Sequence, residues 1–236
     1  MNTVSATSPA TRSYKGASIE ERRHQRRERL IDAALEVFAR RGISKTTIRD
    51  ICSEARLTER YFYESFKSTE EAFDAVYLHL KCQLVARVTE ALSHAPQSVE
   101  QLASGGLRAF YVFLREDPRR AQIMLIDAFT ANQRSQEKSK KAVREYIELV
   151  RQLAATLYPD LYKKLDFEML AGGLLGMAIQ VGMIWARSNY EKPIEEVLGY
   201  NLYAWQGLEA RLQDMATQNE KSETRKKAVA VKRKAA

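Results

Sequence analysis

Apolar residues recur at helical spacing along most of this chain. The first such stretch spans residues 19–41 and is followed by Gly42, which suits a helix C-cap. Its apolar face comprises Leu30, Ala34, Val37 and Phe38. The same period predicts further helices over about 47–55, 58–66, 69–94, 98–116, 118–130, 135–157, 166–188 and 193–215. Because no segment alternates as a strand would, we expect an all-α protein of about nine helices.

The second and third helices are short and closely spaced, which is typical of a helix-turn-helix unit. Thr47-x-x-Asp50 matches a capping box at the start of the second helix, and Thr58 can cap the third. In the third helix Phe62 and Phe66 lie one turn apart and are expected to face inward. The consecutive rings at residues 61–63 point in different directions on a helix, so at least one ring must face outward.

These patterns divide the chain into four parts. We expect a flexible arm over residues 1–18, an N-terminal three-helix unit with the helix-turn-helix over 19–68, and a C-terminal helical domain over 69–217. The polar, strongly basic segment 218–236 is expected to be disordered.

The net charge and its position along the chain indicate what kind of partner to expect. The chain has 236 residues and a formal net charge of +8, but much of the excess lies in the last segment. A polyanion is therefore a reasonable partner, although the body of the protein is not a generic cation. The polar start of the sequence contains no secretory signal, so a cytoplasmic location is expected.

Other functional classes find little support. Cys52 and Cys82 have no ligand-like spacing to the three scattered His residues, so neither a metal site nor a disulfide framework is expected. No phosphate-binding glycine loop or nucleophile motif is present, which argues against an enzyme and against a cofactor. The uncharged run Met169–Ala186 is close to the length of a membrane span. Its glycines and Gln180 favour a buried helix–helix contact instead, and no membrane partner is expected.

The segment "TTIRDICSEARLTERYFYESFKSTEEAF" resembles the DNA-binding segment of TetR-family (TetR/AcrR-like) transcriptional regulators. The resemblance is strong over about residues 25–80, whereas the remainder is similar only in helix number and in its glycine-rich penultimate helix. It implies a DNA-binding surface made of Thr46, Thr47, Arg49, Thr58, Glu59, Arg60, Tyr61, Tyr63 and Lys67.

On a helix in the major groove, the first residues reach base edges. Arg60 could then bind a guanine, Glu59 a cytosine, and Tyr61 a thymine methyl group or a phosphate. The resemblance gives Tyr63, Thr47 and Lys67 phosphate contacts.

Each of these residues also has a purely structural alternative. Glu59 and Arg60 could be solvated, Tyr61 could pack on the first helix, and Tyr63 could be a packing residue. Arg49 could pair with Glu54. Thr46 could serve only as a cap.

The sequence departs from the family pattern at several positions. Arg56 stands where the family usually has Gly, and a left-handed conformation there would cost about 1 kcal/mol. Glu64, Ser65 and Thr69 replace residues that commonly strengthen the phosphate contacts. An arginine-rich stretch of the first helix could compensate, or could simply form a solvated face; it comprises Arg22, Arg23, Arg26 and Arg27.

The resemblance also implies an effector cavity and a two-fold dimer built from the last two long helices. The candidates to line the cavity are Phe110, Tyr111, Phe113, Arg115, Met124, Asp127, Phe129, Tyr146 and Trp185. The candidates for the dimer interface are Gly176, Gln180, Met183, Leu198, Leu202 and Trp205. A monomeric core helix is the alternative for the glycine-rich segment.

The expected function is a sequence-specific repressor that reads an inverted-repeat operator in double-stranded DNA as a homodimer. A small, largely apolar effector would release it from the operator. The alternative is a non-specific architectural DNA-binding protein that uses its basic tail and first helix.

Overall fold

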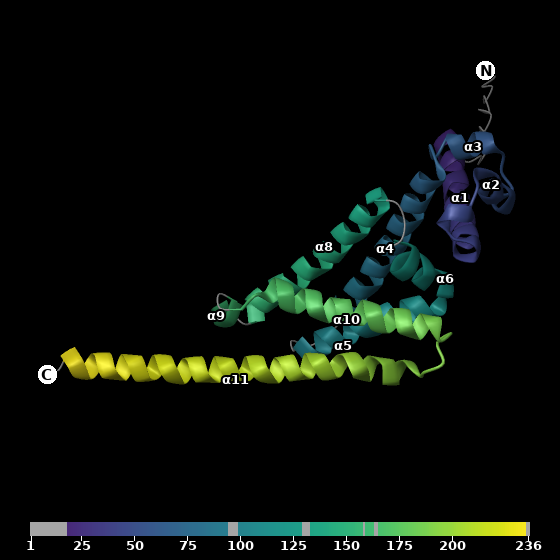
Figure 1. Ribbon diagram of the computed structural model, residues 1–236. Helices are drawn as coiled ribbons and strands as arrows, with labels where there is room; N and C mark the ends of the chain where they lie inside the picture. The colour runs from purple at the N-terminus through teal and green to yellow at the C-terminus, as the bar shows by residue number, and fades with distance from the viewer. Residues whose placement is uncertain (1–17, 94–98, 129–132, 158, 163–164, 235–236) are drawn as a thin grey trace, which may run out of the picture.

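The computed structural model describes residues 18–93, 99–128, 133–157, 159–162 and 165–234, and these are helical with short connections. The all-α class is thereby confirmed for the described residues. At one end lies a compact N-terminal unit, which appears at the upper right of Figure 1. It consists of α1 (Ile19–Arg41), the 3-10 turn η1 (Ile43–Lys45), α2 (Ile48–Ala55) and α3 (Glu59–Tyr63).

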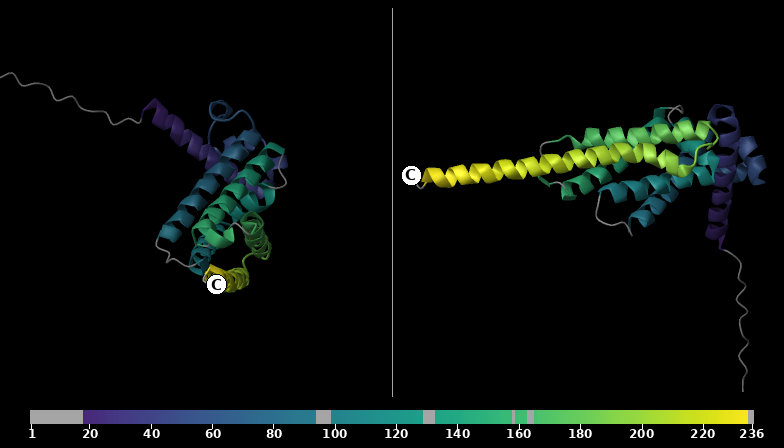
Figure 2. Two further views of the ribbon diagram at one scale, coloured as in Figure 1. Left: turned by 90° about the vertical axis from the view of Figure 1, so that its left-hand side faces the viewer. Right: turned by 90° about the horizontal axis from the view of Figure 1, so that it is seen from below.

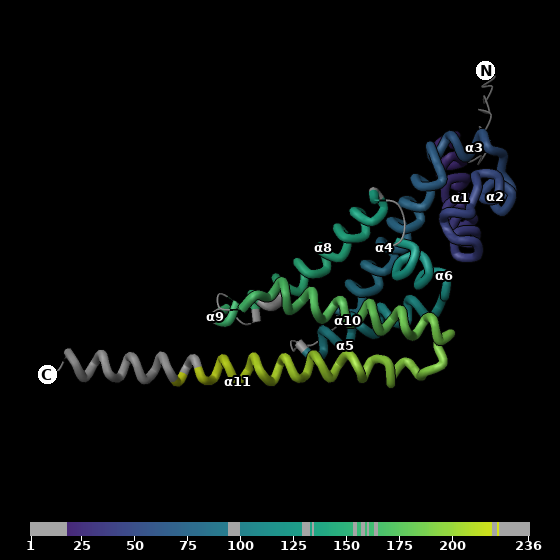
Figure 3. Tube along the Cα trace, viewed as in Figure 1, coloured from purple at the N-terminus to yellow at the C-terminus, as the bar shows by residue number. Residues whose placement is uncertain are grey.

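Helix α4 (Thr69–Ser93) leads from this unit into a larger helical domain, and the path of the chain can be followed in Figure 3. That domain contains α5 (Val99–Glu116), α6 (Pro118–Ala121), η2 (Gln122–Asp127), α8 (Gln133–Leu157), α9 (Pro159–Tyr162), α10 (Phe167–Arg187) and α11 (Ile194–Lys234). Helices α10 and α11 run alongside one another in both views of Figure 2, and α5 packs against each of them.

The start and end of α1 follow the local chemistry of the sequence. The Ser18 hydroxyl accepts a hydrogen bond from the Glu21 amide, and the Glu21 carboxylate accepts one from the Ser18 amide, which completes a capping box. At the other end Gly42 takes a φ of 76°, and its amide donates to the Phe38 carbonyl. The predicted apolar face is confirmed, because Leu30, Ala34, Val37 and Phe38 are all buried.

Three helix boundaries differ from the predictions. Helix α3 is only five residues long, because the chain turns at Glu64 and Ser65 before α4. The helix expected over 118–130 is α6 followed by the π-helical η2. The predicted end of the last helix near Met215 is wrong, since α11 continues to Lys234 and residues 218–234 are helical rather than disordered. No Gly or Pro follows Gly207 to stop that helix, and its Ala, Lys, Arg and Glu residues favour helix.

One apolar core continues from the N-terminal unit into the larger domain. The ring of Phe38 in α1 meets that of Phe73 in α4 edge to face, with 5.4 Å between centroids. A second, smaller cluster gathers Leu161, Phe167 and Leu212 near α9. The expected flexible arm at residues 1–17 lies outside the described residues.

Helix α10 is apolar and long enough to cross a membrane by composition alone. One side of it is buried against the rest of the domain, including Ala171, Ala178 and Trp185. Its other side is exposed and includes Met169, Gly173, Gly176, Gln180 and Ile184. A single such helix packed into a helical domain is weak evidence for a membrane span.

Candidate nucleic-acid interface and effector cavity

The second and third helices are joined by a turn that depends on Arg56. The capping box predicted at the start of α2 is confirmed, with the Thr47 hydroxyl and the Asp50 carboxylate each accepting a backbone hydrogen bond. The hydrogen bonds from Thr47 hold the pKa of Asp50 below its usual value. At the end of α2, Arg56 adopts the left-handed conformation with φ 52° and ψ 45°. The family's glycine turn is therefore formed here by an ordinary residue.

Helix α3 has polar residues exposed at its start and buried Phe side chains on its inner side. Phe62 and Phe66 are buried as predicted, with 0% and 2% of their surface exposed. Thr58, Glu59 and Arg60 are exposed at the start of the helix. Thr58 occupies the N-cap position, but its side chain makes no capping hydrogen bond, so the expected cap is wrong. Its hydroxyl is thus not committed to the helix.

The three aromatic rings that follow one another in α3 have different environments. The Tyr63 side chain is exposed, and it meets the Phe62 ring edge to face. The Tyr61 ring is half-buried, with the guanidinium of Arg26 lying 4.5 Å from its centroid. Packing on α1, one of the two alternatives for Tyr61, is therefore observed. Tyr63 is the ring that faces outward.

Both charged residues at the start of α3 are paired within the chain. Arg49 on α2 lies 3.6 Å from the Glu59 carboxylate, and Arg60 lies 3.3 Å from Glu64 one turn later. The expected alternative of an Arg49–Glu54 pair is wrong, because Glu54 pairs with Arg40. These surface pairs are weak, so DNA can replace them at small cost.

Three of the four arginines at positions 22–27 of α1 support α3 and the turn after it. Arg23 donates to the Glu64 carbonyl at 3.0 Å, and Arg27 donates to the Ser65 carbonyl at 3.5 Å. Arg27 also lies over the Phe66 ring, and Arg26 lies 3.7 Å from the Glu64 carboxylate. We call Arg23, Arg26 and Arg27 the α1 arginine cluster. Cations suit these positions, because carbonyls at a helix end carry partial negative charge.

The sequence did not predict this supporting role. The arginine positions were visible, but their partners lie about 40 residues further along the chain. Arg22, by contrast, is exposed.

Two further predicted DNA contacts have different environments. Thr46 is buried and donates its hydroxyl to the Gly42 carbonyl at 2.8 Å, so it stabilises the turn before α2 instead of facing solvent. Lys67 is exposed just after α3, and its amide donates to the Glu71 carboxylate.

An apolar cavity of about 230 Å³ lies within the larger domain. Residues from α4, α5, η2, α8, α10 and α11 line it. Of the predicted lining residues, Phe110, Met124 and Tyr146 do line it. Phe129 lies outside the described residues.

The remaining predictions for the cavity are wrong. Tyr111, Phe113 and Trp185 are packed in the core beside it, and Arg115 is exposed on α5. Asp127 is buried but accepts a hydrogen bond from Gln122 and does not line the cavity. Helical spacing identified these residues as inward-facing, but it could not separate a cavity wall from a filled core.

The predicted dimer residues lie in different environments. Gly176 and Gln180 lie on the exposed face of α10, and Met183 is half-buried beside them. Leu198 is buried in the chain's own core, and Leu202 is half-buried against it. Trp205 lines the cavity. Exposed aromatic residues on α11 are Tyr200 and Tyr203, which the prediction omitted.

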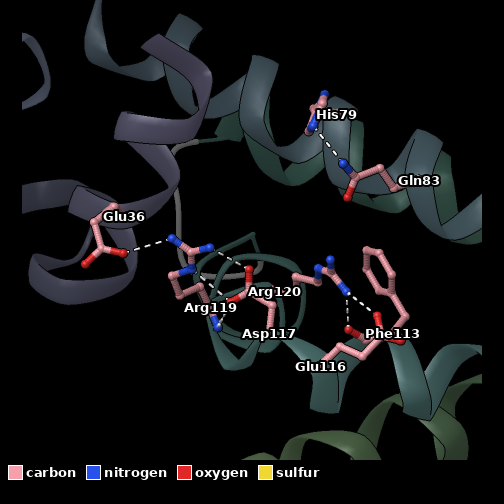
Figure 4. A network of polar contacts seen from close by, with 8 residues as sticks. All are labelled: Glu36, His79, Gln83, Phe113, Glu116, Asp117, Arg119 and Arg120. Carbon is pink, nitrogen blue, oxygen red and sulfur yellow. Dashed lines mark hydrogen bonds and ion pairs between the residues drawn. The ribbon is translucent and has the colours of Figure 1, made fainter. Parts of the chain in front are cut away.

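A polar link joins the N-terminal unit to the larger domain, as Figure 4 shows. Arg119 on α6 donates to the Glu36 carboxylate of α1 at 2.9 Å and to both carboxylate oxygens of Asp117. The hydrogen bonds from Arg119 hold the pKa of Asp117 below its usual value. Directly after α6, Met124 and Leu125 of η2 reach the cavity. A short stretch of chain therefore connects the cavity wall with α1.

This arrangement defines a helix-turn-helix DNA-binding protein with a helical cavity domain. In the described part of the chain, no group of three or more His, Cys, Asp or Glu residues could hold a metal ion. The family model for "Bacterial regulatory proteins, tetR family" matches residues 30–76. The chain is thus similar to TetR-family transcriptional regulators, and residues 30–76, which include α2 and α3, carry the likeness.

Curated relatives agree with this likeness. The chain is 25% identical over 189 residues to the HTH-type transcriptional activator FasR of Mycolicibacterium smegmatis, covering 79% of this chain and 84% of that protein. It is 30% identical over 100 residues to the HTH-type transcriptional repressor KstR2 of the same organism, covering 42% and 47%. Both activators and repressors thus occur among the relatives.

Solved structures share the fold across both domains. The fatty acid degradation regulator FadR from Bacillus halodurans superposes with a TM-score of 0.67 at 16% identity, covering 80% of this chain and 95% of that one. FadR from Bacillus subtilis, in complex with stearoyl-CoA, superposes with a TM-score of 0.66 at 15% identity, covering 75% and 95%. At these identities the likeness concerns the fold.

Proposed function

We propose that this protein is a cytoplasmic, sequence-specific repressor that a small, largely apolar effector releases from its operator. The observation that carries the proposal is the presence in one chain of an exposed α3 surface and a hydrocarbon-lined cavity. Residues 19–68 would form the DNA-binding domain, and residues 69–217 the effector-binding and dimerisation domain.

The proposed recognition surface is the exposed start of α3. Thr58, Glu59 and Arg60 would face base edges in the major groove. Tyr63, with 58% of its surface exposed, would contact a phosphate together with Thr47 and Lys67. Arg49 on α2 would be freed from Glu59 when DNA binds.

A homodimer is proposed because a lone helix-turn-helix reads few bases, and such modules usually act on half-sites about one turn of DNA apart. The exposed face of α10 and the exposed tyrosines of α11 offer a self-complementary apolar surface. The small residues Gly173 and Gly176 would let two copies of α10 approach closely. Two-fold symmetry would match an inverted-repeat operator.

The cavity supports an apolar effector. Long hydrocarbon chains are reasonable first probes, because a structural neighbour was solved with stearoyl-CoA. Two elements connect the cavity with the DNA-binding unit: α4, which lines the cavity with Leu84 and Val88, and the segment from η2 through Arg119 to Glu36. Ligand binding would release DNA only if the ligand prefers the state in which these helices are displaced.

Selection of genomic fragments by the purified protein, followed by footprinting in about 150 mM salt, tests the proposal. We expect protection of a short inverted repeat by the wild type and its loss in Arg60→Ala. Arg211→Ala, an exposed change on α11, serves as the control and keeps the footprint. Fragments without a common motif, bound equally by all three proteins, would instead support the non-specific architectural alternative, whose affinity falls steeply with salt.

A further inference from the structure

Among the described residues that line the cavity, none has a charged side chain. The wall is made of aliphatic, Met and Phe side chains, with the exceptions of Tyr77, Tyr146 and Trp205. Burying an unpaired carboxylate or phosphate in such surroundings would cost far more than the burial of its hydrocarbon chain returns. A ligand that enters this cavity therefore leaves charged groups outside or has none.

Two hydrogen-bond donors in this wall have no partner within the described part of the chain. They are the Tyr146 hydroxyl on α8 and the Trp205 indole nitrogen on α11, and both atoms are buried. By contrast, two buried aromatic side chains outside the cavity do have hydrogen-bond partners. The Trp185 indole donates to the Lys192 carbonyl at 2.9 Å, and the Tyr111 hydroxyl donates to the Ala178 carbonyl at 3.1 Å.

A buried donor without a partner destabilises the folded protein, so two of them in one cavity call for an occupant. Water suits the site poorly, because a buried water normally makes two to four hydrogen bonds and this wall is almost entirely apolar. Burial raises the pKa of Tyr146 to about 12. The phenol therefore keeps its proton at neutral pH and can donate, as the indole always does.

We propose that the cavity binds an uncharged, hydrocarbon-rich molecule with an acceptor oxygen, such as a ketone or an ester, which accepts hydrogen bonds from Tyr146 and Trp205. The proposal rests on the assignment of this cavity as the effector site. It deepens that assignment by naming the chemistry of the polar group and by excluding a charged group inside.

Three probes of equal chain length test this: octane, 2-octanone and octanoate. Binding to the full-length protein is followed through the ligand-induced rise in melting temperature over a range of concentrations, without DNA. We expect 2-octanone to bind about tenfold more tightly than octane, as one hydrogen bond contributes about 1.4 kcal/mol. Octanoate should bind more weakly than the ketone.

Substitutions that remove each donor, read as the preference for the ketone over octane, separate hydrogen bonding from packing. Tyr146→Phe should lower the affinity for 2-octanone toward that of octane and leave octane binding unchanged. Trp205→Phe should reduce the preference for the ketone in the same way. Arg144→Ala, an exposed change on α8, is the control and should change nothing.

Equal affinities for octane and 2-octanone, octanoate binding as tight as that of the ketone, or no binding of any probe would overturn the proposal. An unchanged ketone preference in both Tyr146→Phe and Trp205→Phe would do so too. Because no operator is involved, these outcomes are independent of the footprint. A protein that protects an inverted repeat yet prefers octanoate would keep its regulatory assignment and lose this ligand class.

Discussion

A single residue, Arg56, carries backbone strain at the centre of the helix-turn-helix. Its φ of 52° places a side chain in the left-handed region, where glycine is free of penalty. The Arg56 amide still donates to the carbonyls that end α2, so the helix ends in a hydrogen-bonded turn. The strain is therefore a cost in stability, without a change of architecture.

We expect Arg56→Gly to raise the free energy of unfolding by about 1 kcal/mol. Urea denaturation of the two proteins measures the difference. Arg56→Ala is the control, because it removes the side-chain charge and keeps the β-carbon, and it should give little or no gain. Equal stabilisation by both substitutions would show that charge, and not the backbone, is responsible.

A buried chain of hydrogen bonds centred on Tyr111 links three helices. Tyr111 accepts a hydrogen bond from the Asn201 amide at 2.7 Å and donates to the Ala178 carbonyl, which ties α5 to α10 and α11. Burial raises the pKa of Tyr111 above its ordinary value near 10. The unfolded phenol thus ionises at a lower pH than the folded one.

Stability from this residue is therefore present in full below about pH 10 and is lost as the pH rises toward the folded pKa. Urea unfolding at about pH 8 and about pH 10.5 should show the decline. Tyr111→Phe should weaken that pH dependence, and at about pH 8 it should cost about 1–3 kcal/mol, because Asn201 and Ala178 lose their partner. An unchanged slope would contradict the expectation.

At the scale of elements, the short α3 depends on α1 for its position. A five-residue helix is too short to be stable alone, since most helical stability comes from packing. The α1 arginine cluster contacts α3 and the turn that follows it. Its guanidinium groups donate to the Glu64 and Ser65 carbonyls and lie over the Tyr61 and Phe66 rings. Three arginines of α1 thus support α3.

We expect the double substitution Arg23→Ala, Arg27→Ala to lower operator affinity on the order of tenfold through a loosened α3. The dependence of affinity on salt should stay unchanged, because no phosphate contact is removed. Arg22→Ala, on the same helix, should leave affinity unaltered. A shallower salt slope in the double variant would mean that these arginines bind phosphates.

In the whole molecule, an ion pair and the segment α6–η2 lie between the cavity and the N-terminal unit. The Glu36–Arg119 pair joins α1 to α6, and η2 extends from α6 into the cavity wall. Together with α4, this segment is a route by which a ligand in the proposed effector site would shift the N-terminal unit. Both side chains are about 40% exposed, so the pair contributes modestly.

We expect Glu36→Gln to leave ligand affinity in the absence of DNA unchanged and to reduce the coupling between ligand and operator by about 0.5–1 kcal/mol. Operator titrations with and without the ligand measure the coupling. Glu116→Gln, which alters ion pairs within the larger domain only, is the matched control. Loss of coupling in both variants would place the route elsewhere.

Much of this protein could be predicted from local patterns. Most of the helix ranges, the capping box at Thr47 and the buried pair Phe62 and Phe66 depend on residues within about one helical turn of one another. These interactions are fixed by backbone geometry and side-chain chemistry, so the sequence by itself determined the all-helical class and the helix-turn-helix.

Only the tertiary structure decided which inward-facing residues surround an empty space and which fill the core. Phe110 and Tyr111 are neighbours in one helix, yet only Phe110 lines the cavity. The partners of Arg23 and Arg119 lie 41 and 83 residues away in the sequence. Trp205, which was expected at the dimer interface, lines the cavity. Such outcomes depend on how helices pack together, and helical periodicity records only which face of a helix is apolar.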